Sequence, residues 1–213
     1  MTTVNKVEQI ENYLEELYPN PKCELEYSKD YELLLATMLS AQTTDKRVNQ
    51  VTRVLFRKYP SLEALKDAPR ADIEEIIKPI GTYQRKSLYV KEIATIIVDQ
   101  YGGKTPSDRK ILESLPGIGH KTVNVFLSNI YDVPAIAVDT HVERVSKRLG
   151  LAKKDDSVLA VEKKLEKYFD PSVWGRRHHQ LVLFGRYHCK SMKPECDSCK
   201  LQEICKYYKT LKK

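Results

Sequence analysis

The sequence has no long apolar run, no low-complexity segment and no alternation of polar and apolar residues long enough to predict a sheet. No run approaches the roughly 18 apolar residues that a membrane span requires. The polar, glutamate-rich N-terminus is typical of neither a signal peptide nor a transit peptide. Glycine and proline, at 8 and 10 of 213 residues, are too few for a disordered or collagen-like chain. We therefore expect a soluble, cytoplasmic globular protein of one large or two small domains.

The charge is unevenly distributed. The chain has a net charge of +7, of which residues 104–213 carry +9 and residues 1–103 carry −2. Basic residues confined to one half indicate a surface that faces a polyanion such as nucleic acid, although solvated lysines alone would give the same count.

The cysteines are concentrated at one end of the chain. One of the five stands alone at position 23, and the other four fall within residues 189–205. An odd total, with four of the five packed at one end, is a poor disulfide framework and a good metal site. The four are separated by six, two and five residues: Cys189, Cys196, Cys199 and Cys205. Four thiolates can bind a [4Fe–4S] cluster or a structural zinc ion, but zinc sites usually pair two C-x₂₋₄-C motifs and only one is present.

Apolar residues recur with helical spacing along nearly the whole chain, which predicts an all-α fold. The stretch 31–39 is apolar enough to be a buried central helix. Pro, Gly and capping residues divide the rest into further helices, expected near residues 4–17, 48–58, 62–67, 70–78, 83–101, 108–114, 121–130, 141–149, 156–168 and 172–186.

The stretch from Leu115 to Thr122 reads Leu-Pro-Gly-Ile-Gly-His-Lys-Thr and lies between two predicted helices. Two glycines two residues apart predict a tight hairpin, because glycine reaches positive φ and lets a ligand approach the backbone closely. Backbone N–H groups at such a hairpin and at the following helix N-terminus can grip a phosphate of any sequence. The arrangement resembles the helix-hairpin-helix element of DNA repair proteins.

The resemblance extends further. Lys121 at the start of the second helix, Asp139 after an apolar run 18 residues later, and the cysteine spacing together resemble the endonuclease III family of base-excision DNA glycosylases. This resemblance implies two helical domains: a barrel with the hairpin over residues 22–134, and a domain of residues 1–21 and 135–213 that holds a [4Fe–4S] cluster at 189–205. It also implies an active site in the cleft between the two domains.

Lys121 matches the family's Schiff-base lysine. An amine that attacks the sugar C1′ must be neutral, whereas a free lysine is protonated at pH 7. Its position in the first helical turn disfavours the ammonium, and partial burial would do so again. The simpler alternative is a lysine that contacts a phosphate or is merely solvated.

Asp139 matches the family's catalytic aspartate, which stabilises the oxocarbenium character that develops as the base leaves. The alternative role is capping of the helix that follows. Thr140 and Glu143 form a T-x-x-E pattern that can cap this helix by itself, so the sequence predicts that the Asp139 carboxylate is available for catalysis.

Further positions are predicted to contact DNA. Gln42 has both donors and an acceptor, so it can fill the gap left by a flipped nucleotide opposite different bases. Thr82 stands where the family usually has a leucine that wedges into the base stack, and threonine is shorter and polar. Lys86 is a candidate phosphate contact or part of a solvated helix face. In the hairpin itself the expected contacts are Leu115, Gly117 and Gly119.

The resemblance implies a monomeric, nucleoid-associated, bifunctional enzyme that acts on double-stranded DNA. It would excise oxidised pyrimidines of the thymine glycol type and cut the abasic site by β-elimination. One alternative is an adenine glycosylase acting opposite oxidised guanine, which lacks the nucleophilic lysine and carries a further C-terminal domain. A second is a non-catalytic helix-hairpin-helix module, and a third, a zinc deaminase or nuclease, would need a histidine or carboxylate among the ligands.

Overall fold

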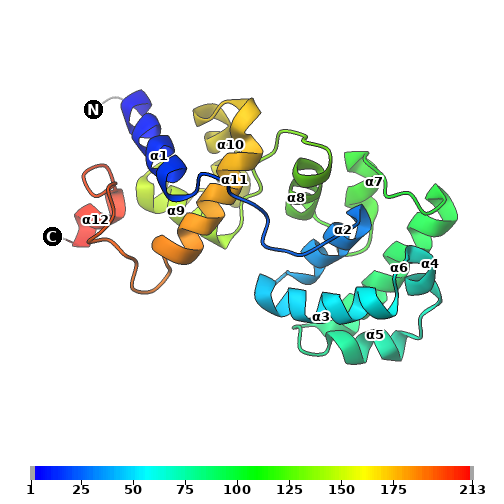
Figure 1. Cartoon of the computed structure of the whole chain (residues 1–213). Coiled ribbons are helices and arrows are strands. Elements are labelled where there is room, and N and C mark those ends of the chain that lie inside the picture. Colours follow the sequence, from blue (N-terminus) through cyan, green and yellow to red (C-terminus); the bar gives the residue numbers. More distant parts are fainter. Residues whose placement is uncertain (1–2, 212–213) are drawn as a thin grey trace. The chain divides into compact units, whose positions relative to one another are not determined.

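The computed structural model describes residues 3–211, and every regular element between them is helical, which confirms the predicted all-α fold (Figure 1). The chain forms two compact units, one of Cys23–Tyr131 and one in which the residues up to Lys22 join those from Asp132 onward. The boundaries between the two units therefore follow residues 22 and 131, whereas the resemblance implies domain boundaries after residues 21 and 134. None of the helices within residues 3–211 is both long and apolar enough to cross a bilayer.

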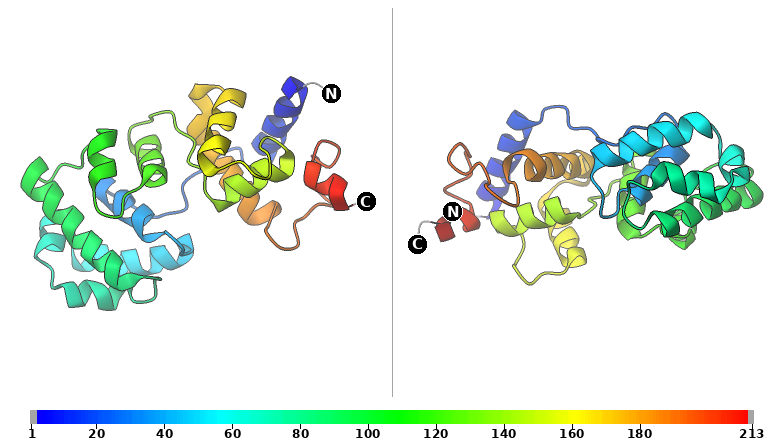
Figure 2. Two further views of the ribbon diagram at one scale, coloured as in Figure 1. Left: turned by 180° about the vertical axis from the view of Figure 1, so that it is seen from behind. Right: turned by 90° about the horizontal axis from the view of Figure 1, so that it is seen from below.

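The unit of residues 23–131 is built around α2 (Asp30–Leu39), in which nine of ten residues are buried. Because the helix is apolar on every side, it has to be enclosed by other helices. It contacts α3 (Asp45–Lys58), α6 (Tyr83–Tyr101) and α8 (His120–Ile130), as Figures 1 and 2 show. The remaining helices of this unit are α4 (Leu62–Asp67), α5 (Arg70–Ile77) and α7 (Arg109–Ser114).

The other unit is built around α9 (Thr140–Leu149), which contacts α10 (Val158–Tyr168), α11 (Trp174–Leu183) and α12 (Lys206–Leu211). One predicted helix, 172–186, is three elements here. A short turn η1 (Pro171–Val173) precedes α11, and a wider helical turn η2 (Phe184–His188) follows it. The amide of Cys189 donates to the carbonyl of Phe184 at 2.6 Å, so the chain leaves the helix in a widened turn at the first cysteine.

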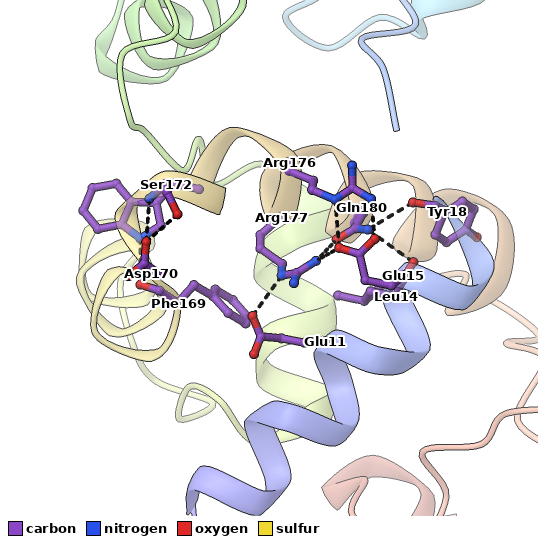
Figure 3. A network of polar contacts seen from close by, with 11 residues as sticks. Glu11, Leu14, Glu15, Tyr18, Phe169, Asp170, Ser172, Arg176, Arg177 and Gln180 are labelled. Carbon is purple, nitrogen blue, oxygen red and sulfur yellow. Dashed lines mark hydrogen bonds and ion pairs between the residues drawn. The ribbon is translucent and has the colours of Figure 1, made fainter. Parts of the chain in front are cut away.

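Helix α1 (Thr3–Leu17) joins this unit through ion pairs to two arginines of α11, one of which is buried, as Figure 3 shows. Arg177 of α11 is only 6% exposed, and its guanidinium donates to Glu11 at 3.1 Å and to Glu15 at 2.5 Å. The hydrogen bonds from Arg176 and Arg177 lower the pKa of Glu15 to about 2. A buried charge is retained only where it is paired, so this network fixes α1 against α11.

Candidate active site and metal centre

The hairpin between α7 and α8 is anchored by two apolar residues, Leu115 and Ile118, which are buried in the core of their unit. Gly117 lies between them with φ +73°, in the left-handed region that favours glycine. A Cβ atom on Gly117 would collide with the ring of Tyr89. Glycine is therefore required here by the fold itself, through both the backbone angle and the packing of Tyr89.

Gly119 differs from Gly117 in both respects. Its φ of −109° is accessible to any residue, and a Cβ atom on it would meet no atom of the protein within 4 Å. It is exposed, and as the N-cap of α8 it supplies no side chain to the first turn. The open backbone at the positive end of a helix suits an anion that comes close to the chain.

A group of polar side chains fastens the hairpin to its two helices. Arg109 of α7 donates to Asn124 at 2.8 Å and to Glu113 at 3.3 Å. His120, the first residue of α8, lies with its Nδ1 3.4 Å from Glu113 and its Nε2 3.3 Å from Asn124. Because these contacts join α7 to α8 on both sides of the turn, they fix the direction in which α8 begins.

Lys121 is the second residue of α8 and its side chain is exposed. The expected position in the first turn is confirmed, and the residue is not partly buried. The amine is instead accessible from solvent beside the open backbone of Gly119.

Asp139 belongs to the other unit, where it is half-buried and is the N-cap of α9. Its Oδ1 accepts from the backbone N–H groups of His141 and Val142, both at 2.8 Å. The prediction that Thr140 and Glu143 would cap the helix in its place is wrong. Thr140 is already inside the helix, and Glu143 pairs with Lys147 at 2.7 Å. Capping holds the carboxylate in one orientation, which is a requirement for catalysis rather than an obstacle to it.

Gln42 and Thr82 occupy two exposed turns of the unit of residues 23–131. Both have left-handed backbones, with φ of +58° and +56°. This conformation costs on the order of 1 kcal/mol for a residue with a Cβ atom, and more for a β-branched residue such as threonine. Strained, exposed positions of this kind are concentrated at functional sites. Their predicted contact with DNA stays a prediction.

Lys86 is buried, whereas a side chain that contacts a DNA phosphate has to be exposed. The residue is 5% exposed, and its Nζ donates to the carbonyls of Leu39 at 2.9 Å and Ala41 at 2.7 Å. Burial lowers the pKa of this ammonium. The sequence predicts either a phosphate contact or a solvated helix face for Lys86, whereas the structure places its ammonium in the interior, bonded to the end of α2.

The four clustered cysteines line one cavity, together with Phe184, His188 and Tyr207. Its empty volume, including its open mouth, is about 340 Å³. Burial and, to a lesser extent, the negative charges of the other three cysteines raise the pKa of the Cys199 thiol to about 11. Within residues 3–211, no group of three or more His, Cys, Asp or Glu side chains is placed so that it could hold a metal ion. The four thiols around one cavity are nevertheless the type and number of donors that a [4Fe–4S] cluster takes.

Two arginines of α9 hold the start of the cysteine loop, and sequence reasoning missed both. Arg148 donates to the carbonyls of Lys190 at 2.6 Å and Ser191 at 2.9 Å. Arg144 donates to Cys189 at 3.3 Å and to Gly185 at 2.6 Å. One feature of the sequence indicates this role: the i, i+4 spacing of the two arginines places both on one face of a helix. The helix that Asp139 caps is therefore bonded directly to the cysteine loop.

Comparison with known proteins agrees with this geometry. Residues 35–171 match the model of the HhH-GPD superfamily of base excision DNA repair proteins. Endonuclease III of Bacillus subtilis strain 168 is 44% identical over 206 residues, which are 97% of this chain and 94% of that protein. Endonuclease III of Escherichia coli K12 is 39% identical over 206 residues, 96% of this chain and 97% of that protein.

Solved structures give the same result. A trapped endonuclease III–DNA covalent intermediate superimposes with a TM-score of 0.95 at 43% identity, and the match covers 100% of both chains. Both the identity and the coverage extend far beyond the hairpin and the cysteine loop. The chain belongs to the HhH-GPD superfamily of base excision DNA repair proteins and, within it, to the endonuclease III family.

Proposed function

We propose that the protein is a bifunctional DNA glycosylase that excises oxidised pyrimidines and cuts the resulting abasic site by β-elimination. The observation that carries this proposal is Lys121: an exposed amine in the first turn of α8, directly after an anion-accessible hairpin. A glycosylase without lyase activity needs no amine at this position. The match to a trapped endonuclease III–DNA covalent intermediate supports the same chemistry.

The reaction follows from the groups present. The neutral Nζ of Lys121 attacks C1′ of the damaged nucleotide, and the bond from C1′ to the base nitrogen breaks, with the base leaving as its protonated form. Opening of the sugar gives an imine between Nζ and C1′. Loss of a proton from C2′ then breaks the bond between C3′ and its oxygen, and the strand is cut. Water finally releases Lys121 from the product.

Asp139 assists the first of these steps. Its negative charge stabilises the positive charge that develops on the sugar as the base leaves. The two backbone N–H groups that donate to Oδ1 hold the carboxylate in place at the start of α9. We assign oxidised pyrimidines because endonuclease III relatives match over nearly the whole chain. The presence of Lys121 argues against the adenine glycosylase alternative.

A panel of duplexes tests the substrate class. Each duplex carries one feature: thymine glycol, adenine opposite 8-oxoguanine, an abasic site, or no damage. We expect cutting at thymine glycol and at the abasic site only. Removal of adenine opposite 8-oxoguanine would support the adenine glycosylase instead. Tight binding with no cutting of any duplex would support a non-catalytic module.

The two hairpin glycines are expected to respond differently to alanine. Gly117→Ala should lower the stability by on the order of 1 kcal/mol or more, because φ is positive and Tyr89 occupies the space. Gly119→Ala should leave the melting temperature nearly unchanged, because its Cβ would meet no other part of the protein. It should weaken DNA binding, because the added methyl group would take up space that we assign to a phosphate. Thermal unfolding and DNA titration of both variants check this. If Gly119→Ala binds DNA with the same affinity as the wild type, the hairpin is not part of the DNA-binding surface.

We assign Cys189, Cys196, Cys199 and Cys205 as the ligands of a [4Fe–4S] cluster, because all four line one cavity. When bound, the cluster cross-links the loop and neutralises the four thiolates. The protein purified without oxygen should then be yellow-brown and contain about four irons and four sulfides per chain. Stoichiometric zinc without iron, in protein made with abundant iron, would contradict the cluster.

A further inference from the structure

Two exposed turns of one unit have left-handed, non-glycine residues at their tips. One turn follows α2 and contains Gln42, and the other precedes α6 and contains Thr82. They are about forty residues apart in sequence, and neither is a glycine that would adopt this conformation freely. Within residues 3–211 only two other non-glycine residues have a positive φ, Asp132 and Lys193. Something in the surrounding structure has to hold each turn in this form.

Lys86 is bonded to both turns at once. Its backbone N–H donates to the carbonyl of Thr82 at 3.1 Å, which closes the first turn of α6. Its side chain runs inward and donates to the carbonyls of Leu39 and Ala41, at 2.9 and 2.7 Å. Ala41 directly precedes Gln42 in the chain. Lys86 therefore links the two turns: its backbone N–H bonds to the Thr82 turn, and its ammonium bonds to the chain just before Gln42.

These bonds solve a local problem at the end of α2. The last carbonyls of a helix have no partner within the helix, and the negative end of the dipole faces them. A cation is the strongest donor for such carbonyls. An interior ammonium is nevertheless costly to desolvate, and this cost offsets part of what the two bonds contribute to stability. What the bonds supply besides stability is a defined geometry, because both accepting carbonyls are held by one ammonium.

We propose that Lys86 is a positioning residue that sets the spacing between the Gln42 and Thr82 turns, so that both enter DNA together when a nucleotide is flipped. Lys86 does not contact the DNA. The inference rests on the proposed function, because it concerns how that enzyme opens the duplex. It also explains why Lys86 is buried, although an exposed lysine on this helix could bind a phosphate.

The chain provides a matched control. Lys91 lies on the same helix, α6, and its half-buried Nζ also donates to two carbonyls, those of Lys66 at 2.7 Å and of Ala68. These carbonyls lie at the end of α4 and belong to neither of the two turns. Lys91→Met therefore removes the same kind of interaction from the same helix without touching the Gln42 turn. It should affect stability without affecting DNA opening.

The test compares Lys86→Met, Lys86→Arg and Lys91→Met on three measurements. The first is the fluorescence of 2-aminopurine opposite the target nucleotide, which reports insertion into the duplex. The second is the single-turnover rate of base release from a thymine glycol duplex. The third is the salt dependence of binding to undamaged DNA. The wild-type protein is first tested for base release and strand cutting. If it does neither, the proposed function is wrong, and this outcome is distinct from a failure of the role assigned to Lys86.

We expect Lys86→Met and Lys86→Arg both to lower insertion and base release by between about tenfold and a hundredfold, because small displacements of positioning groups have effects of this size. Salt dependence should be unchanged, since no phosphate contact is lost. Lys91→Met should match wild type in all three measurements. A Lys86→Met protein that inserts and releases the base like wild type would overturn the proposal. So would a Lys86→Arg protein that retains activity while Lys86→Met loses about one unit of salt slope, the result for a phosphate contact.

A double-mutant cycle separates positioning from general loosening of the fold. If Lys86 acts through Gln42, then Lys86→Met should cause little further loss of insertion in a Gln42→Ala background. Fully additive losses would contradict the proposal. Should Lys86→Met not fold, Lys86→Gln keeps a neutral N–H donor in the interior, and the same cycle is run with it.

Discussion

Lys121→Gln is expected to abolish strand cutting while DNA binding survives. The glutamine keeps a polar side chain of similar length but has no amine to attack C1′, so cutting should fall on the order of a thousandfold or more. Binding energy comes from the hairpin backbone and the basic surface, so the affinity should change by no more than about threefold and the salt slope by about one unit at most. Gel-based cutting and titration of one thymine glycol duplex measure both.

The matched control is Lys110→Gln. Lys110 is exposed on α7 of the same hairpin motif, so its loss removes the same charge without removing an amine from α8. Lys110→Gln should cut like wild type. If Lys121→Gln also cuts like wild type, Lys121 is not the nucleophile.

Asp139→Asn should slow base release severely without unfolding the protein. Asparagine caps helices about as well as aspartate, so the two hydrogen bonds to His141 and Val142 can be kept. What is lost is the negative charge, and base release should fall by about a hundredfold or more. Cutting of a preformed abasic site should suffer less, because no base has to be expelled. Single-turnover assays on the two substrates measure the difference.

Asp139→Ala completes this comparison. It lacks both the charge and the cap, so it should lose base release to the same degree and also lose about 1 kcal/mol of stability. Asp139→Asn with wild-type base release would show that Asp139 is a cap and nothing more.

The parts of the fold that sequence reasoning predicted correctly depend on local pattern. The wholly apolar stretch of α2 predicts a helix that is buried on every side, and the structure shows one. The glycines of the hairpin predict a tight turn, and Gly117 has the positive φ that such a turn needs. The all-α class follows from the same periodicity repeated along the chain.

The features that sequence reasoning missed depend on long-range contacts or on a shift of one residue. Whether Asp139 or Thr140 caps α9 is decided by where the chain enters the helix, and the pattern allows either. The burial of Lys86 depends on the end of α2, 47 residues earlier. The arginines that hold the cysteine loop, Arg144 and Arg148, bond to carbonyls more than 40 residues away. No local pattern contains these partners.

Borohydride trapping tests the central claim most directly. If Lys121 attacks C1′, each turnover passes through an imine, and borohydride should reduce that imine to a stable amine that joins protein to DNA. Digestion of the trapped wild-type complex and mass spectrometry should then locate the sugar remnant on the peptide that contains Lys121. The Lys121→Gln protein should give no adduct. An adduct of equal yield on Lys121→Gln, or a wild-type adduct located on the N-terminal amine, would contradict the account.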